Sequence, residues 1–228
     1  TVNGGESRES TMTEVEDDRF TGQIPAQPNG SVVEFSLRAV DNSSKVTPDL
    51  SFELPYVERY VVGYNVPNIR INEFMPENYL GLEDPDDPGD YPDWIELYNA
   101  SDREVSLDGL YFADRLADGQ PDIDAMEAIS DGLTIPPRGY VLFYADRDPE
   151  QGPFHLDFRL NRNGEAVALY GALGTVEIDS IEFPNVPIGV AYGRNPDASN
   201  EWTFLYCNTP GASNRLCDQQ VFMPTISR

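Results

Sequence analysis

One stretch constrains the fold of this chain more than any other. In the seven residues from Asp93 to Asn99, side chains of different polarity alternate. An alternation with a period of two is typical of a β-strand, whose successive side chains point to opposite faces. It predicts that Trp94 and Glu96 lie on one face of the strand and that Ile95 and Leu97 lie on the other. We therefore expect the fold to be organised as a sheet around this strand.

Other short apolar runs end at turn-forming residues in the same way. The chain contains 18 Gly and 19 Pro, spread along it at the ends of these runs. Such punctuation predicts many short strands joined by turns, and hence an all-β fold. In the larger part of the chain the predicted strands are 69–74, 94–99, 104–107, 110–113, 140–144, 166–170, 176–183, 190–192 and 202–205. No apolar run is long enough to span a bilayer, so we expect no membrane insertion.

The charge of the chain excludes one class of partner. Lys and Arg number 15 and Asp and Glu number 40, which gives a formal net charge of -25. Such a charge repels the phosphates of nucleic acids, so we expect no nucleic-acid binding, and it attracts cations. The 228 residues suffice for one large or two small domains. Since the chain opens with Thr1 rather than Met, we expect its N-terminus to be produced by processing.

The residues give little support for catalysis. The single histidine, His155, is accompanied by no motif of a nucleophilic or phosphate-binding site, so we interpret it as structural. We expect no catalytic residue and no enzymatic activity. Two strand carboxylates, Glu73 and Glu96, suggest the acid pair of a glycosidase, but 40 acidic residues make any chosen pair uninformative. We predict instead that these two carboxylates accept backbone N–H bonds and hold a loop in place.

Metal binding is the chemistry that the acidic residues favour. The loop that leads into the 93–99 strand holds six carboxylates, and its prolines limit its conformational freedom. These residues are Glu83, Asp84, Asp86, Asp87, Asp90 and Asp93. Because Ca²⁺ prefers six to eight oxygen ligands, the loop predicts a calcium site, although its spacing is not that of an EF-hand. The alternative is a solvated acidic loop. A second candidate set is Asp114, Asp118, Asp122 and Asp124.

The two cysteines and two tryptophans favour structural roles. Cys207 and Cys217 are close in sequence and predict a disulfide that closes a short loop, which implies an oxidising compartment. The alternative is two free thiols. Trp94 and Trp202 are interpreted as core residues rather than as ligand platforms.

Residues 1–66 predict a small β unit in front of the larger one. The cleanest strand runs from residue 31 to residue 40, and the stretch from Phe20 to Asp41 resembles the C-terminal part of an immunoglobulin-like or fibronectin-like module of secreted bacterial proteins. Such a module needs about seven strands, and only three or four are predicted before residue 66. The unit is therefore incomplete, completed by a strand of another chain, or a smaller β unit resting on the second domain.

Residues 67–215 carry a more specific resemblance. The segments that carry it are I-R-I-N-E-F-M-P, D-W-I-E-L-Y-N-A, V-S-L-D-G-L-Y-F-A-D, I-P-P-R-G-Y-V-L-F, F-R-L-N-R-N-G-E-A-V-A-L-Y and N-T-P-G-A-S-N, in this order. This order resembles a lamin tail domain of the bacterial secreted type. The resemblance implies an immunoglobulin-like β-sandwich that accompanies other domains in secreted and surface proteins. Residues 216–228 form a tail that is predicted either to lie on the sandwich edge as a last strand or to dock on a neighbouring subunit.

These observations predict a non-enzymatic extracellular or cell-surface module of a bacterium, with a structural or adhesive role. It would mediate protein assembly or binding, as part of a larger surface protein or as a filament subunit. The alternative is an accessory domain that tethers a separate hydrolase or nuclease to a polymeric substrate such as a polysaccharide. Other proteins or further copies of this chain are the expected partners, and calcium is the expected cofactor.

Overall fold

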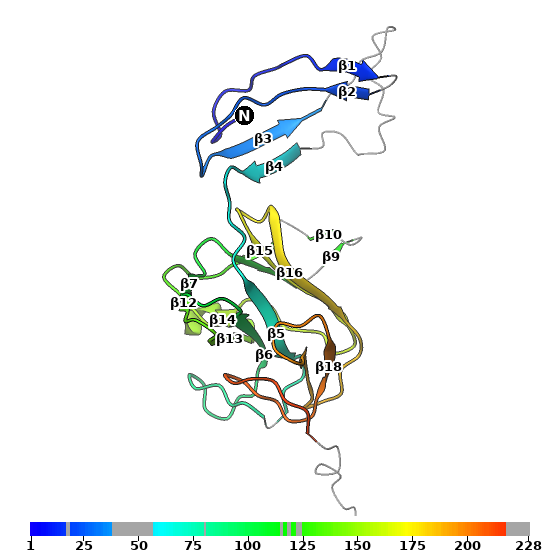
Figure 1. The fold of residues 1–228 in the computed structure, drawn as a ribbon. Helices are drawn as coiled ribbons and strands as arrows, with labels where there is room; N and C mark the ends of the chain where they lie inside the picture. The colour runs from blue at the N-terminus through cyan, green and yellow to red at the C-terminus, as the bar shows by residue number, and fades with distance from the viewer. Residues whose placement is uncertain are drawn as a thin grey trace, which may run out of the picture. The chain divides into compact units, whose positions relative to one another are not determined.

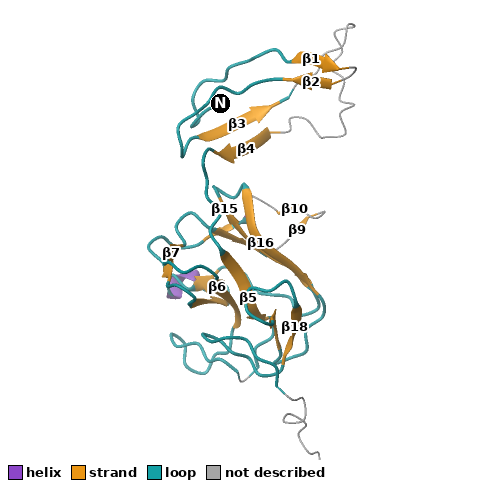
Figure 2. Cartoon of the chain, viewed as in Figure 1, coloured by secondary structure: helices purple, strands orange, loops and turns teal. Residues whose placement is uncertain are grey.

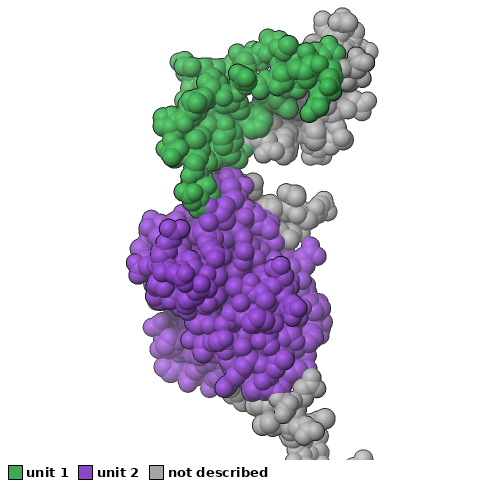
Figure 3. Space-filling view, in the orientation of Figure 1, with its two compact units in different colours: residues 1–65 green, residues 66–228 purple. Residues whose placement is uncertain are grey.

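The computed structural model describes residues 1–16, 19–37, 57–79, 81–114, 116–117, 120–121 and 125–217. The chain divides into two compact units, Thr1–Asn65 and Val66–Arg228, coloured separately in Figure 3. This division lies one residue before the boundary predicted between residues 66 and 67. The described residues contain no α-helix, and Figure 2 shows strands and loops apart from a short helical segment in purple. Accordingly, no described helix has the length and apolar character needed to cross a membrane.

Unit 1 contains two separate antiparallel strand pairs among its described residues (Figure 1). The pairs are β1 (Thr13–Glu16) with β2 (Arg19–Thr21) and β3 (Val32–Ser36) with β4 (Val57–Val61). The strand predicted over residues 31–40 is observed as β3, and residues 38–40 lie outside the described part. Val33 is 2% exposed and is the one buried apolar residue among those described in this unit. Unit 1 therefore has little core of its own within its described residues.

Unit 2 is built on a six-stranded sheet in the order β14-β13-β6-β5-β17-β18. Its strands are β5 (Ile69–Met75), β6 (Asp93–Asn99), β13 (Tyr140–Ala145), β14 (His155–Leu156), β17 (Ala191–Arg194) and β18 (Trp202–Leu205). The alternating stretch from Asp93 to Asn99 is β6, which lies between β13 and β5 inside the sheet. All neighbours are antiparallel except β13 and β14, which run parallel.

A four-stranded antiparallel sheet in the order β11-β8-β15-β16 forms the second layer of unit 2. Its strands are β8 (Tyr111–Ala113), β11 (Glu127–Ala128), β15 (Glu165–Gly171) and β16 (Val176–Phe183). The predicted hairpin is observed between β15 and β16. Short pairs complete the unit: β7 (Val105–Ser106) with β12 (Thr134–Ile135), and β9 (Leu116–Ala117) with β10 (Gln120–Pro121).

The main hydrophobic core lies between these two sheets. Phe74 of the larger sheet packs on Phe183 of the smaller one, with ring centroids 4.7 Å apart. Phe143 packs on Phe112 across the same interface, with centroids 5.3 Å apart. Two sheets whose inner side chains interdigitate are the architecture of a β-sandwich. The predicted immunoglobulin-like β-sandwich is therefore confirmed for the second unit.

A β-bulge in β5 decides which polar residues reach the outer face of the larger sheet. Ile71 pairs with Leu97, but the next pair joins Glu73 to Glu96, so the register shifts by one residue. Without such a shift, strict alternation would place Phe74 and Ile71 on opposite faces; both belong to the main core. Asn72 is the additional residue of the bulge. Asn72 and its neighbour Glu73 are both polar and fully buried.

Candidate functional site

The chain's single histidine lies at the edge of the larger sheet. His155 belongs to β14 and is paired with Tyr144 of β13. The connection between these strands passes through a 3₁₀ helix, η2 (Pro149–Gln151), and Gly152. A backbone hydrogen bond from Tyr144 N to the carbonyl oxygen of Phe154, 2.8 Å long, holds this connection to the edge of the sheet. The His155 residue is 4% exposed, and its ring stacks on Tyr144 with centroids 5.2 Å apart. The imidazole therefore has a fixed orientation.

The acidic loop before β6 is tied by its own side chains. Asn78 is buried and donates to the carbonyl oxygens of Leu82 (2.6 Å) and Pro92 (2.9 Å). Glu83 Oε1 accepts a hydrogen bond from Gly89 N at 2.6 Å. Gly89 has a φ of 101°, a backbone conformation that other residues rarely adopt. These contacts fix the loop, and two of its aspartates face the histidine.

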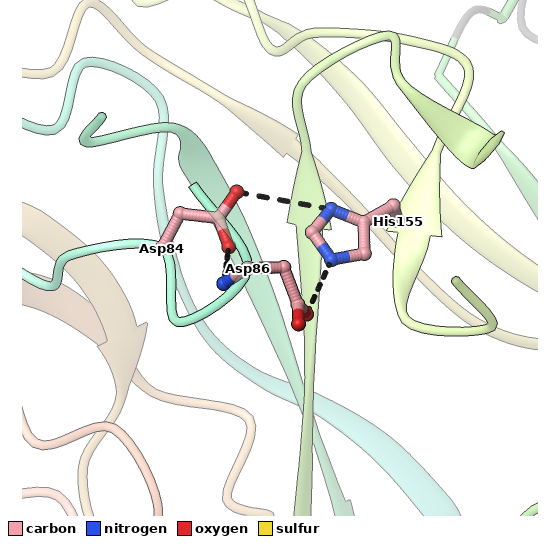
Figure 4. Close-up of side chains that lie close together, drawn as sticks. All are labelled: Asp84, Asp86 and His155. Atoms are coloured by element: carbon pink, nitrogen blue, oxygen red, sulfur yellow. Dashed lines mark hydrogen bonds and ion pairs between the residues drawn. The ribbon is translucent and has the colours of Figure 1, made fainter. Parts of the chain in front are cut away.

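Three aspartates surround the His155 ring: Asp84 and Asp86 from the loop, and Asp146 from the residue after β13. Nδ1 lies 2.6 Å from Oδ2 of Asp146, and Nε2 lies 3.3 Å from Oδ2 of Asp86. Asp84 Oδ2 lies 4.0 Å from Nδ1, which exceeds hydrogen-bond distance. Figure 4 shows Asp84, Asp86 and His155 converging. One potential ligand atom of each lies within 4.8 Å of the other two, so these three residues could hold a metal ion.

One oxygen of this cluster lacks a hydrogen-bond partner. Asp84 is 1% exposed, and its Oδ1 accepts a hydrogen bond from Asp86 N at 2.8 Å. Its Oδ2 is buried and has no hydrogen-bond partner. Leaving a buried polar atom unpaired typically costs about 1–3 kcal/mol, and more for a charged group. Folded proteins rarely leave such an atom without a reason.

The electrostatics of the cluster favour a positive charge at its centre. Burial lowers the pKa of His155, but hydrogen bonds to Asp146 and Asp86 and the charges of Asp146 and Asp84 outweigh burial, so the pKa is raised above its ordinary value. The pKa of Tyr144 is raised by burial and by the charges of Asp84 and Asp86. No Lys or Arg among the described residues forms an ion pair with these three aspartates.

The six carboxylates predicted to bind calcium take different positions. Asp84 and Asp86 join His155, whereas Glu83 bonds to Gly89 within the loop. Asp93 Oδ2 accepts a hydrogen bond from Leu160 N at 3.1 Å, and burial raises the pKa of Asp93 to about 7. The other two, Asp87 and Asp90, are exposed. Calcium binding stays a prediction. Of the second set only Asp114 is described; Asp118, Asp122 and Asp124 lie outside the described residues.

Glu73 and Glu96 hold a loop, as the sequence predicted. Glu73 accepts hydrogen bonds from Thr209 N (3.0 Å) and from Thr209 Oγ1 (2.8 Å). Glu96 Oε2 accepts a hydrogen bond from Gly211 N at 2.5 Å. Burial raises the pKa of Glu73 to about 7 and that of Glu96 to about 8, and the neighbouring negative charge of Asp197 acts in the same direction. Both carboxylates are fully buried and bind the chain itself.

The remaining structural predictions agree with these contacts. Cys207 and Cys217 form a disulfide with a Cα–Cα distance of 5.7 Å, which closes the loop that contains Thr209 and Gly211. Trp94 is fully buried in a second cluster on the outer face of the larger sheet, which confirms its core role. Trp202 is partly buried and packs against the main core. The Arg194 guanidinium lies over the Trp202 ring, 4.5 Å from the ring centroid.

The sequence alone predicts a structural role for His155 and does not reveal its place beside Asp84 and Asp86. His155 follows Asp86 by 69 residues, and the structure joins them because β14 pairs with β13. The spacing of residues along the sequence does not predict a contact between such distant residues. However, the sequence does contain an acidic loop and a single histidine within one predicted domain, and this combination is a signal for the site.

Comparison with known proteins gives one match. The sequence model of the family described as Lamin Tail Domain matches residues 64–185. The matched segment includes β5, β6, β13, β14, β15 and β16, and with them the cluster around His155. No curated protein and no solved structure shows significant similarity to the chain.

Proposed function

Because the chain belongs to the lamin tail domain family, we propose that it is an extracellular or cell-surface module without enzymatic activity that mediates protein assembly or binding. The family is a non-catalytic immunoglobulin-like domain, which is consistent with a structural or binding role. A fold alone does not define function, so the proposal depends on the chemistry of particular residues.

The most deeply buried acids of unit 2 support the absence of catalysis. Glu73 and Glu96 are fully buried, and both bond to the backbone of the segment closed by the disulfide. A glycosidase acid pair must face the substrate with a water or a nucleophile between the two groups. These two carboxylates instead face their own chain. Their role in holding the 207–217 segment accounts for their burial without a reaction.

The disulfide supports an extracellular location. Cys207 and Cys217 are the two cysteines of the chain, and they are bonded to each other. Disulfides persist in oxidising environments and are rare in reducing ones. The net charge of -25 suits a surface exposed to solvent and cations.

The observation that carries the assembly proposal is the exposed apolar surface of unit 1. Six large apolar side chains of its described residues are at least one-third exposed: Met12, Val15, Phe20, Ile24, Leu37 and Tyr60. Phe20 is 56% exposed and Val15 is 55% exposed, on a two-stranded ribbon whose residues are all exposed. Two strands are marginally stable in isolation, and exposed edges and apolar faces favour pairing with another chain.

Sedimentation velocity of the full chain over a series of concentrations tests the assembly proposal. We expect self-association that weakens when a charge enters the exposed ribbon, as in Phe20→Glu. Ile188→Glu is the matched control, because Ile188 is 55% exposed in unit 2 and the variant likewise replaces an exposed apolar side chain with Glu. A wild-type chain that stays monomeric throughout would contradict assembly through unit 1. Equal weakening in both variants would contradict it as well.

Two further results would redirect the proposal. Binding of the monomeric chain to an insoluble polysaccharide would favour the accessory-domain alternative. A hydrolase activity of the purified chain, abolished by the substitution of one carboxylate, would contradict the non-enzymatic role.

A further inference from the structure

Negative charge is concentrated around the His155 ring. Asp84 is buried, its Oδ2 has no hydrogen-bond partner, and Asp146 is 6% exposed. Two buried carboxylates and the imidazole are therefore in contact with a third carboxylate, that of the exposed Asp86, and a protonated imidazole would balance one of the three negative charges. Buried charges are normally paired or coordinate metals. This argument is independent of the loop's acidic composition, because it rests on a buried oxygen of Asp84 that has no hydrogen-bond partner.

The ring of His155 is oriented as a metal ligand. Asp146 Oδ2 lies 2.6 Å from Nδ1, so Nδ1 donates its proton to this carboxylate. Asp146 is itself held by a hydrogen bond from Asp148 N to its Oδ1, at 3.0 Å. A histidine that ligates a metal almost always donates its other ring N–H to a carboxylate, a backbone carbonyl or a water. In the neutral ring Nε2 then carries the lone pair, and it faces Asp86.

When the His155 ring is neutral, the contact between Nε2 and Asp86 is repulsive. Nε2 and Asp86 Oδ2 lie 3.3 Å apart, and both then present lone pairs. A cation between them would turn repulsion into two bonds. Ligand atoms placed about 2.0–2.1 Å from a tetrahedral metal are separated by about 3.3 Å. Asp84 Oδ2 lies 4.0 Å from Nδ1 of the same ring, and one ligand atom of each of the three residues lies within 4.8 Å of the other two, so the Asp84 carboxylate would move toward Nε2 to complete the set.

The mixture of donors selects the class of metal. Ca²⁺ and Mg²⁺ are bound by oxygen atoms, whereas imidazole suits Zn²⁺ and the neighbouring transition metals. The Asp86 side chain is 59% exposed, so one side of the group is open to solvent, and water can supply the remaining ligands. We propose that Asp84, Asp86 and His155 (Figure 4) bind one divalent transition-metal ion, with Asp146 orienting the imidazole. The ion links the loop before β6 to β14, independently of whether unit 1 mediates assembly.

Zn²⁺ is the probe that tests this site, with the full chain first treated with a chelator. Calorimetric titration is expected to show one saturable site, and bound zinc measured after dialysis should match one ion per chain. At a free Zn²⁺ concentration 100 times the dissociation constant, the equilibrium constant for unfolding should fall about 100-fold. Asp146→Asn should weaken binding about 10–100-fold, since Asp146 acts through His155. His155→Gln and Asp84→Asn should weaken it further.

Asp87→Asn is the matched control, because it removes the same charge from an exposed position of the same loop. It should leave the affinity unchanged. Each variant is compared with and without Zn²⁺, so a change in its own stability cancels. Should Asp84→Asn fail to fold, Asp86→Asn at an exposed position carries the test. Absence of saturable binding, equal binding by Asp86→Asn, or a response to Ca²⁺ but not to Zn²⁺ would overturn the proposal.

Discussion

Replacement of Glu96 by Gln should alter how the stability of unit 2 depends on pH. Glu96 is fully buried, it accepts a hydrogen bond from Gly211 N, and no cation among its described contacts compensates its charge. Burial is the largest cause that raises its pKa, and the charges of Glu73 and Asp197 raise it further. Gln keeps the shape and one acceptor oxygen but does not titrate. The variant therefore isolates the effect of charging a buried carboxylate.

The sign and size of the effect follow from this pKa. The folded state raises the pKa from 4.5 to about 8, so between these values the folded protein binds a proton that the unfolded chain has released. This contribution to stability is complete below pH 4.5 and is lost as the pH rises through about 8. At about 1.36 kcal/mol per pKa unit, a difference of about 3.5 corresponds to at most about 5 kcal/mol. Glu96→Gln should thus be similar to the wild type, within about 1 kcal/mol, at low pH and more stable at high pH.

Urea unfolding followed by tryptophan fluorescence measures this difference, because both tryptophans, Trp94 and Trp202, lie in unit 2. The free energy of unfolding of the wild type is expected to fall between pH 4.5 and 8, and the gap to the variant should widen. Glu182→Gln makes the same change at an exposed position of β16 and should follow the wild type. A variant that parallels the wild type at every pH would refute the reasoning.

Three further changes test the packing of unit 2. Trp94→Ala should lower the free energy of unfolding by about 3–5 kcal/mol, whereas Trp94→Phe should lower it much less because Nε1 has no hydrogen-bond partner; urea unfolding measures both. Replacement of Cys207 and Cys217 by Ser should remove about 3 kcal/mol, visible as a lower melting temperature that a reductant no longer affects. Arg194→Met should destabilise unit 2 by about 3–5 kcal/mol, because it leaves buried Asp179 without its ion pair at 2.9 Å, and adding Asp179→Asn should restore part of the loss. A neutral effect of Arg194→Met would contradict the importance of this pair.

The strands of unit 2 were predictable because their signal is local. Residues 176–183 and 202–205 were predicted with the bounds that the structure shows, and β6 differs by a single residue. Two-residue strands such as β12 and β14 escaped prediction, since no period can be read from two residues. Their existence depends on tertiary pairing, with β7 for β12 and with β13 for β14.

The site was predictable only in part. Glu73 and Glu96 stood out as acids among apolar strand residues, and the inference that they accept backbone bonds was correct. The burial of Asp84, by contrast, results from the loop closure by Asn78 and Glu83, which side-chain spacing does not reveal. The meeting of this loop with His155 depends on a parallel strand pair at the sheet edge. Acidic composition predicts a cation site, and the fold places a ring nitrogen of His155 close to two carboxylates of the loop.

The nitrogen resonances of His155 test the metal site most directly, because the chain contains one histidine and the assignment is unambiguous. In ¹⁵N-labelled protein without metal, Nδ1 should be held by Asp146. On addition of Zn²⁺, the Nε2 resonance should shift until one equivalent is bound, while Nδ1 keeps its proton. The same titration of Asp86→Asn should show a much weaker response. Side-chain nitrogens that do not respond to Zn²⁺ in the wild type would contradict the account.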